Sequence, residues 1–348
     1  MKACAIAVAV ITALFVSLGA QSGEIEAPKP LYRDPVHDGA ADPLVIWNRE
    51  EEQWFMFYTN RRANLPPDEI DGVSWVHGTR LGIAESPDGA NWTYRGKADI
   101  NLPPEFGEDD ETHWAPEVLE HGGTYHMYLT AVPGIFSNWG HPRDIVHLTS
   151  DDLLTWDYES TLDLASDRVI DACVFQLDDG TWRMWYNNER DDKSIYYAES
   201  PDLYTWEDRG KVESASQQPG EGPKVFRWKD AYWMLVDVWN GLAVYRSSDA
   251  EEWTRQENDL LAEPGKGLDD LVIGQHADVA VNADRAYVFY FTHPGRLGPD
   301  VEQGGAGAID DFYAFRRSSI QLVELAHEDG ELTADRDAPT YIRLQPPE

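Results

Sequence analysis

Short runs in which aromatic and aliphatic residues alternate recur along the chain, and almost no stretch has helical periodicity. Five of these runs cover residues 54–59, 125–130, 182–187, 232–237 and 287–292. Just upstream of each lies another short strand-like run, at residues 42–47, 117–120, 171–177, 221–228 and 276–282. The pattern predicts an all-β protein built from five copies of one unit.

A seven-residue pattern, Ser-x-Asp-x-x-x-Trp, follows strand-like runs in four of the copies, beginning at Ser86, Ser150, Ser200 and Ser247. Its Ser and Asp favour a turn, and its Trp is expected to begin the next strand. Units of about four short strands that repeat along a chain are typical of a β-propeller. A β-sandwich is the alternative, but it would not require the same turn in copy after copy. We therefore predict a five-bladed β-propeller.

The two ends of the chain and its longest loops complete this prediction. Residues 1–20 have the pattern of a secretory signal peptide, because Lys2 precedes an apolar run that is short for a membrane span and ends in small residues. Residues 21–348 are then one propeller domain, secreted or periplasmic, and the run at 316–325 is expected to close the ring with the N-terminal segment. Loops at 61–78, 100–112 and 134–143 are candidate walls of a cleft.

Acidic residues stand at the start of the predicted inner strands. The first residues of these strands are Asp42, Glu117, Asp171, Glu221 and His276. The inner strands of a propeller all run in the same direction along its central channel, so these side chains would form a ring at one end of the channel. They could instead be water-exposed turn residues, but clustered carboxylates raise one another's pKa and favour an acid/base site. Two facing carboxyl groups are what glycoside hydrolysis requires, and a third can tune the acid.

Four segments resemble glycoside hydrolase family 43: residues 41–46, 114–118, 170–175 and 221–226, one in each of four blades. The resemblance implies an inverting glycosidase in which Asp42 is the general base, Glu221 the general acid and Asp171 the residue that raises the pKa of the acid and orients it. The base and acid carboxyls of inverting enzymes stand roughly 6.5 to 9.5 Å apart. A second Asp-Pro pair makes Asp34 a rival for the base.

The resemblance also implies binding residues around this centre. His276 looks like the axial histidine of the family, which often accompanies a calcium ion or an ordered water; a hydrogen-bonded core histidine without metal is equally open. No cofactor is expected to be required, with structural calcium in the central channel as the option. Trp114 is a candidate platform for sugar stacking, and His113 and Arg296 are candidate contacts for sugar hydroxyl or carboxylate groups.

The charge balance narrows the choice of partners. The chain has 63 acidic residues against 28 Lys plus Arg, a formal net charge of -35. Nucleic acid and anionic membranes are therefore poor partners. This charge would also repel sulfated or uronic-acid polymers unless the cleft carried local Arg or Lys, so we expect a neutral sugar. Cys173 would be the only cysteine left after the signal is removed, which excludes an internal disulfide.

The sugar and the mode of action stay open at this point. Arabinofuranosides and xylosides of a plant or algal polysaccharide are favoured over galactose-type linkages. One alternative is a related propeller family of exo-acting hydrolases that remove anhydrogalactose from red-algal oligosaccharides. Another is a propeller that binds carbohydrate without turnover, which would predict a broken set of carboxylates.

Overall fold

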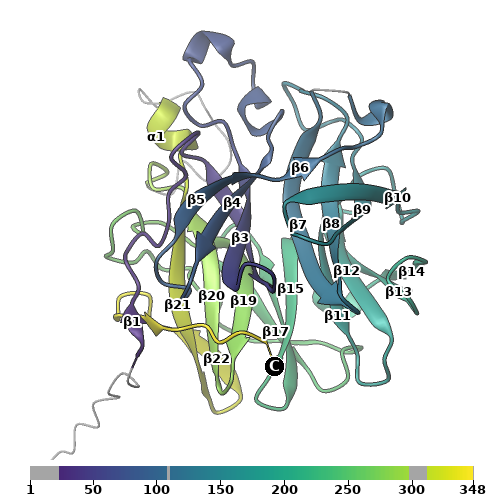
Figure 1. The fold of residues 1–348 in the computed structure, drawn as a ribbon. Coiled ribbons are helices and arrows are strands. Elements are labelled where there is room, and N and C mark those ends of the chain that lie inside the picture. Colours follow the sequence, from purple (N-terminus) through teal and green to yellow (C-terminus); the bar gives the residue numbers. More distant parts are fainter. Residues whose placement is uncertain (1–22, 108–109, 298–311, 348) are drawn as a thin grey trace, which may run out of the picture.

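The computed structural model describes residues 23–107, 110–297 and 312–347. Within these residues, five small antiparallel sheets stand in a ring, and the inner strand of each contacts the inner strand of the next (Figure 1). The prediction of an all-β, five-bladed propeller is confirmed. The segment with the signal-peptide pattern lies outside the described residues. No helix in the described part of the chain is long and apolar enough to cross a membrane.

The blades follow one another in chain order, and each runs outward from its inner strand. The first blade comprises β2 (Ala40–Asn48), β3 (Gln53–Asn60), β4 (Leu81–Ser86) and β5 (Thr93–Lys97). The second comprises β7 (Thr112–His121), β8 (Thr124–Val132), β9 (Asp144–Ser150) and β10 (Thr155–Thr161), with β6 (Asp99–Ile100) parallel to its outer edge. The third comprises β11 (Val169–Gln176), β12 (Trp182–Asn188), β13 (Ser194–Ser200) and β14 (Glu207–Lys211).

The last two blades complete the ring. The fourth comprises β15 (Glu221–Trp228), β16 (Ala231–Asp237), β17 (Leu242–Ser247) and β18 (Thr254–Arg255). The fifth comprises β19 (Gln275–Asn282), β20 (Arg285–Thr292), β21 (Ser319–Glu328) and β22 (Glu331–Ala334). Helical structure among the described residues is limited to α1 (Phe312–Arg316) and four single 3₁₀ turns, Pro67–Glu69, Ser74–Val76, Pro104–Phe106 and Glu213–Ala215.

The N-terminal segment is fastened to the fifth blade. Tyr32 exchanges backbone hydrogen bonds with Ile320 on β21, and β1 (Ile25–Glu26) pairs with β23 (Tyr341–Ile342). The strand expected at 316–325 therefore does pair with the N-terminal segment. It begins only at Ser319, however, because Arg316 belongs to α1.

The repeated turn has the same hydrogen bonds in every copy. In the third blade, Ser200 Oγ accepts the backbone N–H groups of Asp202 and Leu203, while Asp202 Oδ1 accepts those of Tyr204 and Thr205. The corresponding bonds occur in the other three copies. A Ser and an Asp two residues apart thus satisfy four backbone donors between the third and fourth strands, which explains the spacing of the motif.

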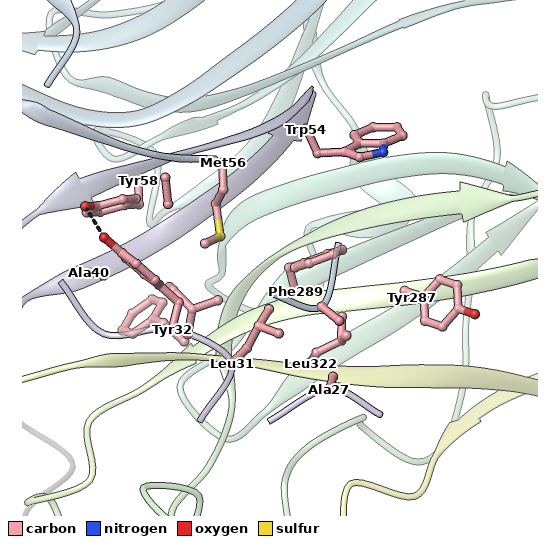
Figure 2. Packing of buried hydrophobic residues seen from close by; sticks show 14 of the residues in the cluster. Ala27, Leu31, Tyr32, Ala40, Trp54, Met56, Tyr58, Tyr287, Phe289 and Leu322 are labelled. Carbon is pink, nitrogen blue, oxygen red and sulfur yellow. Dashed lines mark hydrogen bonds between the residues drawn. The ribbon is translucent and has the colours of Figure 1, made fainter. Parts of the chain in front are cut away.

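The core lies between neighbouring blades. Figure 2 shows the contact between the fifth and first blades, where Met56 and Tyr58 on β3 pack near Phe289 on β20 and Leu322 on β21. The hydroxyls of Tyr58 and Tyr32 lie 3.0 Å apart in this layer. Burial of large apolar side chains between sheets fixes the angle from blade to blade, and with it the positions of the residues at the axis.

Candidate active site

Every inner strand is interrupted by a β-bulge near its beginning. The pairing register shifts between Ala41 and Leu44 in β2, and at the matching place in β7, β11, β15 and β19. Asp42 and Asp171 lie in these bulges with left-handed φ values of 51° and 60°. Non-glycine residues adopt such a conformation at a cost, and they persist at functional sites where the surrounding structure enforces it.

The bulges correct the expected ring of equivalent acidic residues. Asp42 and Asp171 do match, and their counterparts in the second and fourth blades are Ala115 and Gly222, with φ values of 37° and 60°. Glu221 therefore lies one position earlier than the two aspartates. Glu117 lies two positions later, because it follows the register shift as Leu44 does. A one-residue bulge cannot be read from the alternation of side chains, so the sequence placed these groups in a single layer.

The three predicted catalytic carboxylates nevertheless meet at one end of the axis. Asp42 and Asp171 are 6 % and 7 % exposed. Asp171 Oδ2 accepts the backbone N–H of Gly222 at 3.0 Å, which couples it to the residue that follows Glu221. His276 Nδ1 lies 3.5 Å from Asp42 Oδ1. A Cβ at position 222 would come within 3 Å of the His276 ring, so the ring needs this glycine.

Both oxygens of Glu221 already have partners. Lys193 Nζ lies 2.6 Å from Oε2, and the indole Nε1 of Trp239 donates to Oε1 at 3.3 Å. Lys193 also contacts Glu189 at 3.0 Å. Burial raises the pKa of Glu221, but the ammonium of Lys193 outweighs burial, and the net direction is downward.

The pKa values of two neighbouring carboxyl groups shift upward instead. Burial raises the pKa of Asp171 to about 7; His276 opposes the rise, and the charges of Glu221 and Asp42 add to it. Burial and Glu221 likewise raise the pKa of Asp237 to about 7. The surrounding carboxylates raise the pKa of His276, although its burial acts against them. Carboxyl groups whose environments push their pKa values apart are what acid/base catalysis requires.

Asp42 is held by an arginine from the loop after β3. Arg61 Nη2 donates to both carboxylate oxygens, at 3.2 and 3.3 Å. The other terminal nitrogen of Arg61 lies 3.0 Å from His293 Nε2. His293 Nδ1 lies 3.0 Å from the carbonyl of Arg317, so Nδ1 carries the proton and Nε2 accepts from Arg61. This chain of contacts fixes the orientation of the Asp42 carboxyl group.

A cavity of about 300 Å³ opens beside this group, between the fourth and fifth blades. Trp239, Gln275, His293 and Arg296 are among its lining residues. Trp239 connects it to Glu221, and His293 connects it to Asp42 through Arg61. The cavity is therefore one residue away from Glu221 and two residues away from Asp42, the carboxylates that would act on a glycosidic bond.

The other predicted site residues do not all lie at the cavity. Arg296 lines the cavity. Trp114 is partly exposed and occupies the register position of Glu221 in its own blade; its ring centroid is 6.0 Å from that of Trp139. The side chain of His113 is fully buried and has no surface with which to contact a sugar. The rival base Asp34 is occupied structurally, because it accepts the Tyr58 hydroxyl and the backbone N–H of Val36.

Sequence reasoning missed the residues that surround the carboxylates: Arg61, Lys193, Asp237, Trp239 and His293. Four of them lie beyond the ends of the repeated strands, where no periodic signal exists. The sequence did contain a signal for Asp237. Thr59 and Thr130 occupy the register position of Asp237 in the first two blades. Each accepts the N–H of the bulge residue in the next blade, as Asp237 does for His276. An acidic residue at this position was visible in the sequence.

The sequence profile of glycosyl hydrolases family 43 matches residues 32–238, more than half of the chain. The chain belongs to glycosyl hydrolase family 43. It is therefore a glycoside hydrolase, as the acidic residues at the starts of the inner strands and the family resemblance predicted. No curated protein matches the chain.

Solved structures share the fold of this family 43 chain at low sequence identity. A thermostable family-43 glycoside hydrolase is 20 % identical, with a TM-score of 0.59, and the match covers 91 % of this chain and 98 % of that one. A β-xylosidase/α-arabinofuranosidase from a compost microbial metagenome, solved with xylotriose in a calcium-free form, is 16 % identical, with a TM-score of 0.60 and coverages of 88 % and 98 %. An exo-β-1,3-galactanase from Phanerochaete chrysosporium, with galactose, is 13 % identical, with a TM-score of 0.63 and coverages of 90 % and 66 %.

Between Glu117 and Asp278, the channel of this family 43 propeller does not fit a calcium ion. Lys224 Nζ lies 2.9 Å from Glu117 and 2.8 Å from Asp278 in the channel below the bulges. Calcium prefers six to eight oxygen ligands, whereas here a buried ammonium already neutralises the axial carboxylates. No group of three or more His, Cys, Asp or Glu side chains in the described part of the chain could hold a metal ion.

Proposed function

We propose that this family 43 enzyme is a secreted or periplasmic glycosidase that cleaves plant or algal oligosaccharides with inversion of configuration. Asp42 activates the attacking water, Glu221 protonates the departing oxygen, and Asp171 tunes and orients Glu221. The observation that carries these roles is the pair of left-handed bulges that places Asp42 beside His276 and Asp171 on the backbone N–H of Gly222, the residue after Glu221. Arg61 supports the role of Asp42, because a general base has to be held in a fixed position to take a proton from the attacking water.

The favoured substrates are xylosides and arabinofuranosides. The match to the β-xylosidase/α-arabinofuranosidase, which covers nearly all of that chain, supports this choice. The second candidate is a galactose-type linkage cleaved from a chain end, and the likeness to the exo-β-1,3-galactanase supports it. In both cases Lys224 supplies the axial cation, so the reaction needs no calcium.

The test is hydrolysis of a panel of arabino-, xylo- and galacto-oligosaccharides by the parent and by Asp42→Asn, Asp171→Asn and Glu221→Gln. General acid/base groups contribute about 10²- to 10⁴-fold, so each substitution should lower kcat by that factor for the same substrate. Glu120→Gln, at the far end of β7, is the control and should retain full activity. The anomer released, followed by NMR, reports inversion, and full activity in Glu221→Gln would refute the assigned acid.

A further inference from the structure

The two reacting carboxylates of the proposed site each have a cation of their own. Arg61 is paired with Asp42, and Lys193 is paired with Glu221. Arg296 is the remaining cation of the cavity, and no carboxylate among the described residues lies within ion-pair distance of it. A guanidinium without a carboxylate partner among the described residues is a candidate binding group for an anionic ligand.

Arg296 is held in a fixed position. Its backbone N–H closes a turn onto the carbonyl of His293 at 2.9 Å. A Cβ on Gly295 would lie 2.1 Å from the carbonyl oxygen of Ala314, so this turn packs directly against the backbone of α1. The guanidinium lies 4.5 Å from the centroid of the Phe315 ring, and Nε donates to the Phe315 carbonyl at 3.3 Å. A side chain fixed in this way loses little entropy when it binds a ligand.

The bonds that fix Arg296 leave one edge of its guanidinium available. Because Nε is engaged, the two terminal nitrogens form the free end of the fork, and Arg296 belongs to the lining of the cavity. This end-on pair of donors matches the two oxygens of a carboxylate or a sulfate. A single sugar hydroxyl would use only one of the two donors.

The rest of the cavity wall supports an anionic ligand. The chain has 63 acidic residues, yet none of the described residues that line the cavity is acidic. Burial and the nearby charge of Arg61 lower the pKa of Arg296 to about 9, which is the direction expected for a cation without a counter-charge. An anion in the cavity would supply that counter-charge.

We infer that the cavity beside Arg296 binds an acidic group on the substrate, either the carboxylate of a hexuronic acid or a sulfate ester, on the sugar at the cleaved bond or next to it. This inference rests on the proposed glycosidase function and narrows its substrate class. It replaces the expectation of a neutral sugar, which held only if the cleft lacked local Arg or Lys. The net charge of -35 acts at long range and is screened by salt, whereas the contact with Arg296 acts inside the cavity.

The experiment compares matched substrates that differ only in the acidic group. Xylo-oligosaccharides with and without a glucuronic acid branch form one pair, and galacto-oligosaccharides with and without a sulfate ester form the other. The parent should hydrolyse the acidic member of one pair with a kcat/KM at least about tenfold higher, and the pair that shows this preference distinguishes a carboxylate from a sulfate. Arg296→Met should remove the preference by lowering kcat/KM for the acidic member about 10- to 100-fold more than kcat/KM for the neutral member.

Two further variants keep the result interpretable. Arg296→Lys retains the charge without the fork and should keep part of the preference, which separates lost recognition from lost folding. Arg227→Met, an exposed arginine near the other end of β15, should change neither member. A parent that prefers the neutral member of both pairs, or an Arg296→Met variant that loses activity equally on both members, would overturn the inference.

Failure of the glycosidase proposal would give a different result. If no member of either pair is hydrolysed, calorimetric binding of the same four oligosaccharides to the parent and to Arg296→Met still tests the cavity. Tighter binding of an acidic member by the parent alone supports the acidic ligand, and equal binding of both members overturns it.

Discussion

Replacing Lys224 by methionine should destabilise the whole propeller, because its ammonium joins the blades at the axis. Lys224 on β15 binds Glu117 on β7 and Asp278 on β19. The remaining oxygens of these carboxylates accept the backbone N–H groups of Val174 on β11 and Val45 on β2. One buried lysine and two carboxylates therefore connect all five inner strands.

The expected loss follows from the burial of this triad. The side chains of Glu117 and Asp278 are 7 % and 5 % exposed, so Lys224→Met would leave two buried carboxyls without a cation. Removing one partner of a buried ion pair costs about 3 to 5 kcal/mol of unfolding free energy. From the unfolding entropy per residue, each kcal/mol lowers the Tm of a chain of this length by about 1.5 °C. We expect a decrease in Tm of roughly 5 to 8 °C at neutral pH.

The pH dependence of the decrease provides a second check. Burial already raises the pKa of Glu117 in the parent although Lys224 opposes it, so in the variant the folded-state pKa of Glu117 lies still further above its unfolded value. Such a group binds protons more tightly in the folded state, so its penalty is absent at acidic pH and grows as the pH rises through the folded pKa. Calorimetry at several pH values should show the smallest difference from the parent at the acidic end.

Controls separate the ion triad from general effects of the substitution. Lys97→Met, at an exposed position on β5, should leave the Tm within about 1 °C because surface ion pairs contribute little. Adding Glu117→Gln and Asp278→Asn to Lys224→Met should recover much of the loss, since the uncompensated charges are then gone. A Lys224→Met protein as stable as the parent at neutral pH, or equally destabilised at every pH, would refute the reasoning.

Three further predictions concern the active site, the repeated turns and the axis. Lys193→Met should raise the pKa of Glu221, so the alkaline limb of the kcat/KM profile should move to higher pH. Each unit of rise in this pKa increases the protonated fraction of Glu221 about tenfold at pH values above the pKa. An alkaline limb that does not move would exclude Glu221 as the acid. Asp88→Ala removes the acceptor of two backbone N–H groups and should lower the unfolding free energy, measured by denaturant titration, by about 1 to 3 kcal/mol. The control, Asp157→Ala on β10, should lower it little. Equal losses in the two variants would contradict the role assigned to the turn. Chelators should change neither activity nor Tm of the parent, and a calcium-dependent Tm would contradict an axis neutralised by Lys224.

The fold could be predicted because its determinants are local and repeated. The Ser-x-Asp turn satisfies its own backbone donors, so it needs the same residues at the same spacing in each copy. The inner strands also carry their apolar residues at matching places, because each blade repeats the same local structure. What the sequence did not reveal was the bulge in each inner strand, which holds Asp42 and Asp171 at its left-handed position and leaves Glu117 after the register shift.

The charges around the carboxylates could not be predicted, because they come from loops of unequal length. Arg61 follows β3, Lys193 lies between β12 and β13, and Arg296 follows β20. No repeat fixes how far each loop reaches, so their side chains meet the axis only in three dimensions. Arg296 entered the prediction through the family resemblance, and that resemblance did not indicate that it lacks a counter-charge.

On the proposed roles, Glu221 and Asp171 compete for one proton. Lys193 at 2.6 Å favours the charged form of Glu221, while burial favours the neutral form of Asp171. An acid has to hold its proton when the glycosidic bond breaks, so the contact with Lys193 has to weaken once the substrate is bound. Glu189 lies 3.0 Å from the same ammonium, so Lys193 can leave Glu221 without losing every carboxylate partner. The proton that Asp171 retains near neutral pH is then available to the neighbouring acid, and for this reason Asp171→Asn should impair kcat more than the loss of one hydrogen bond would.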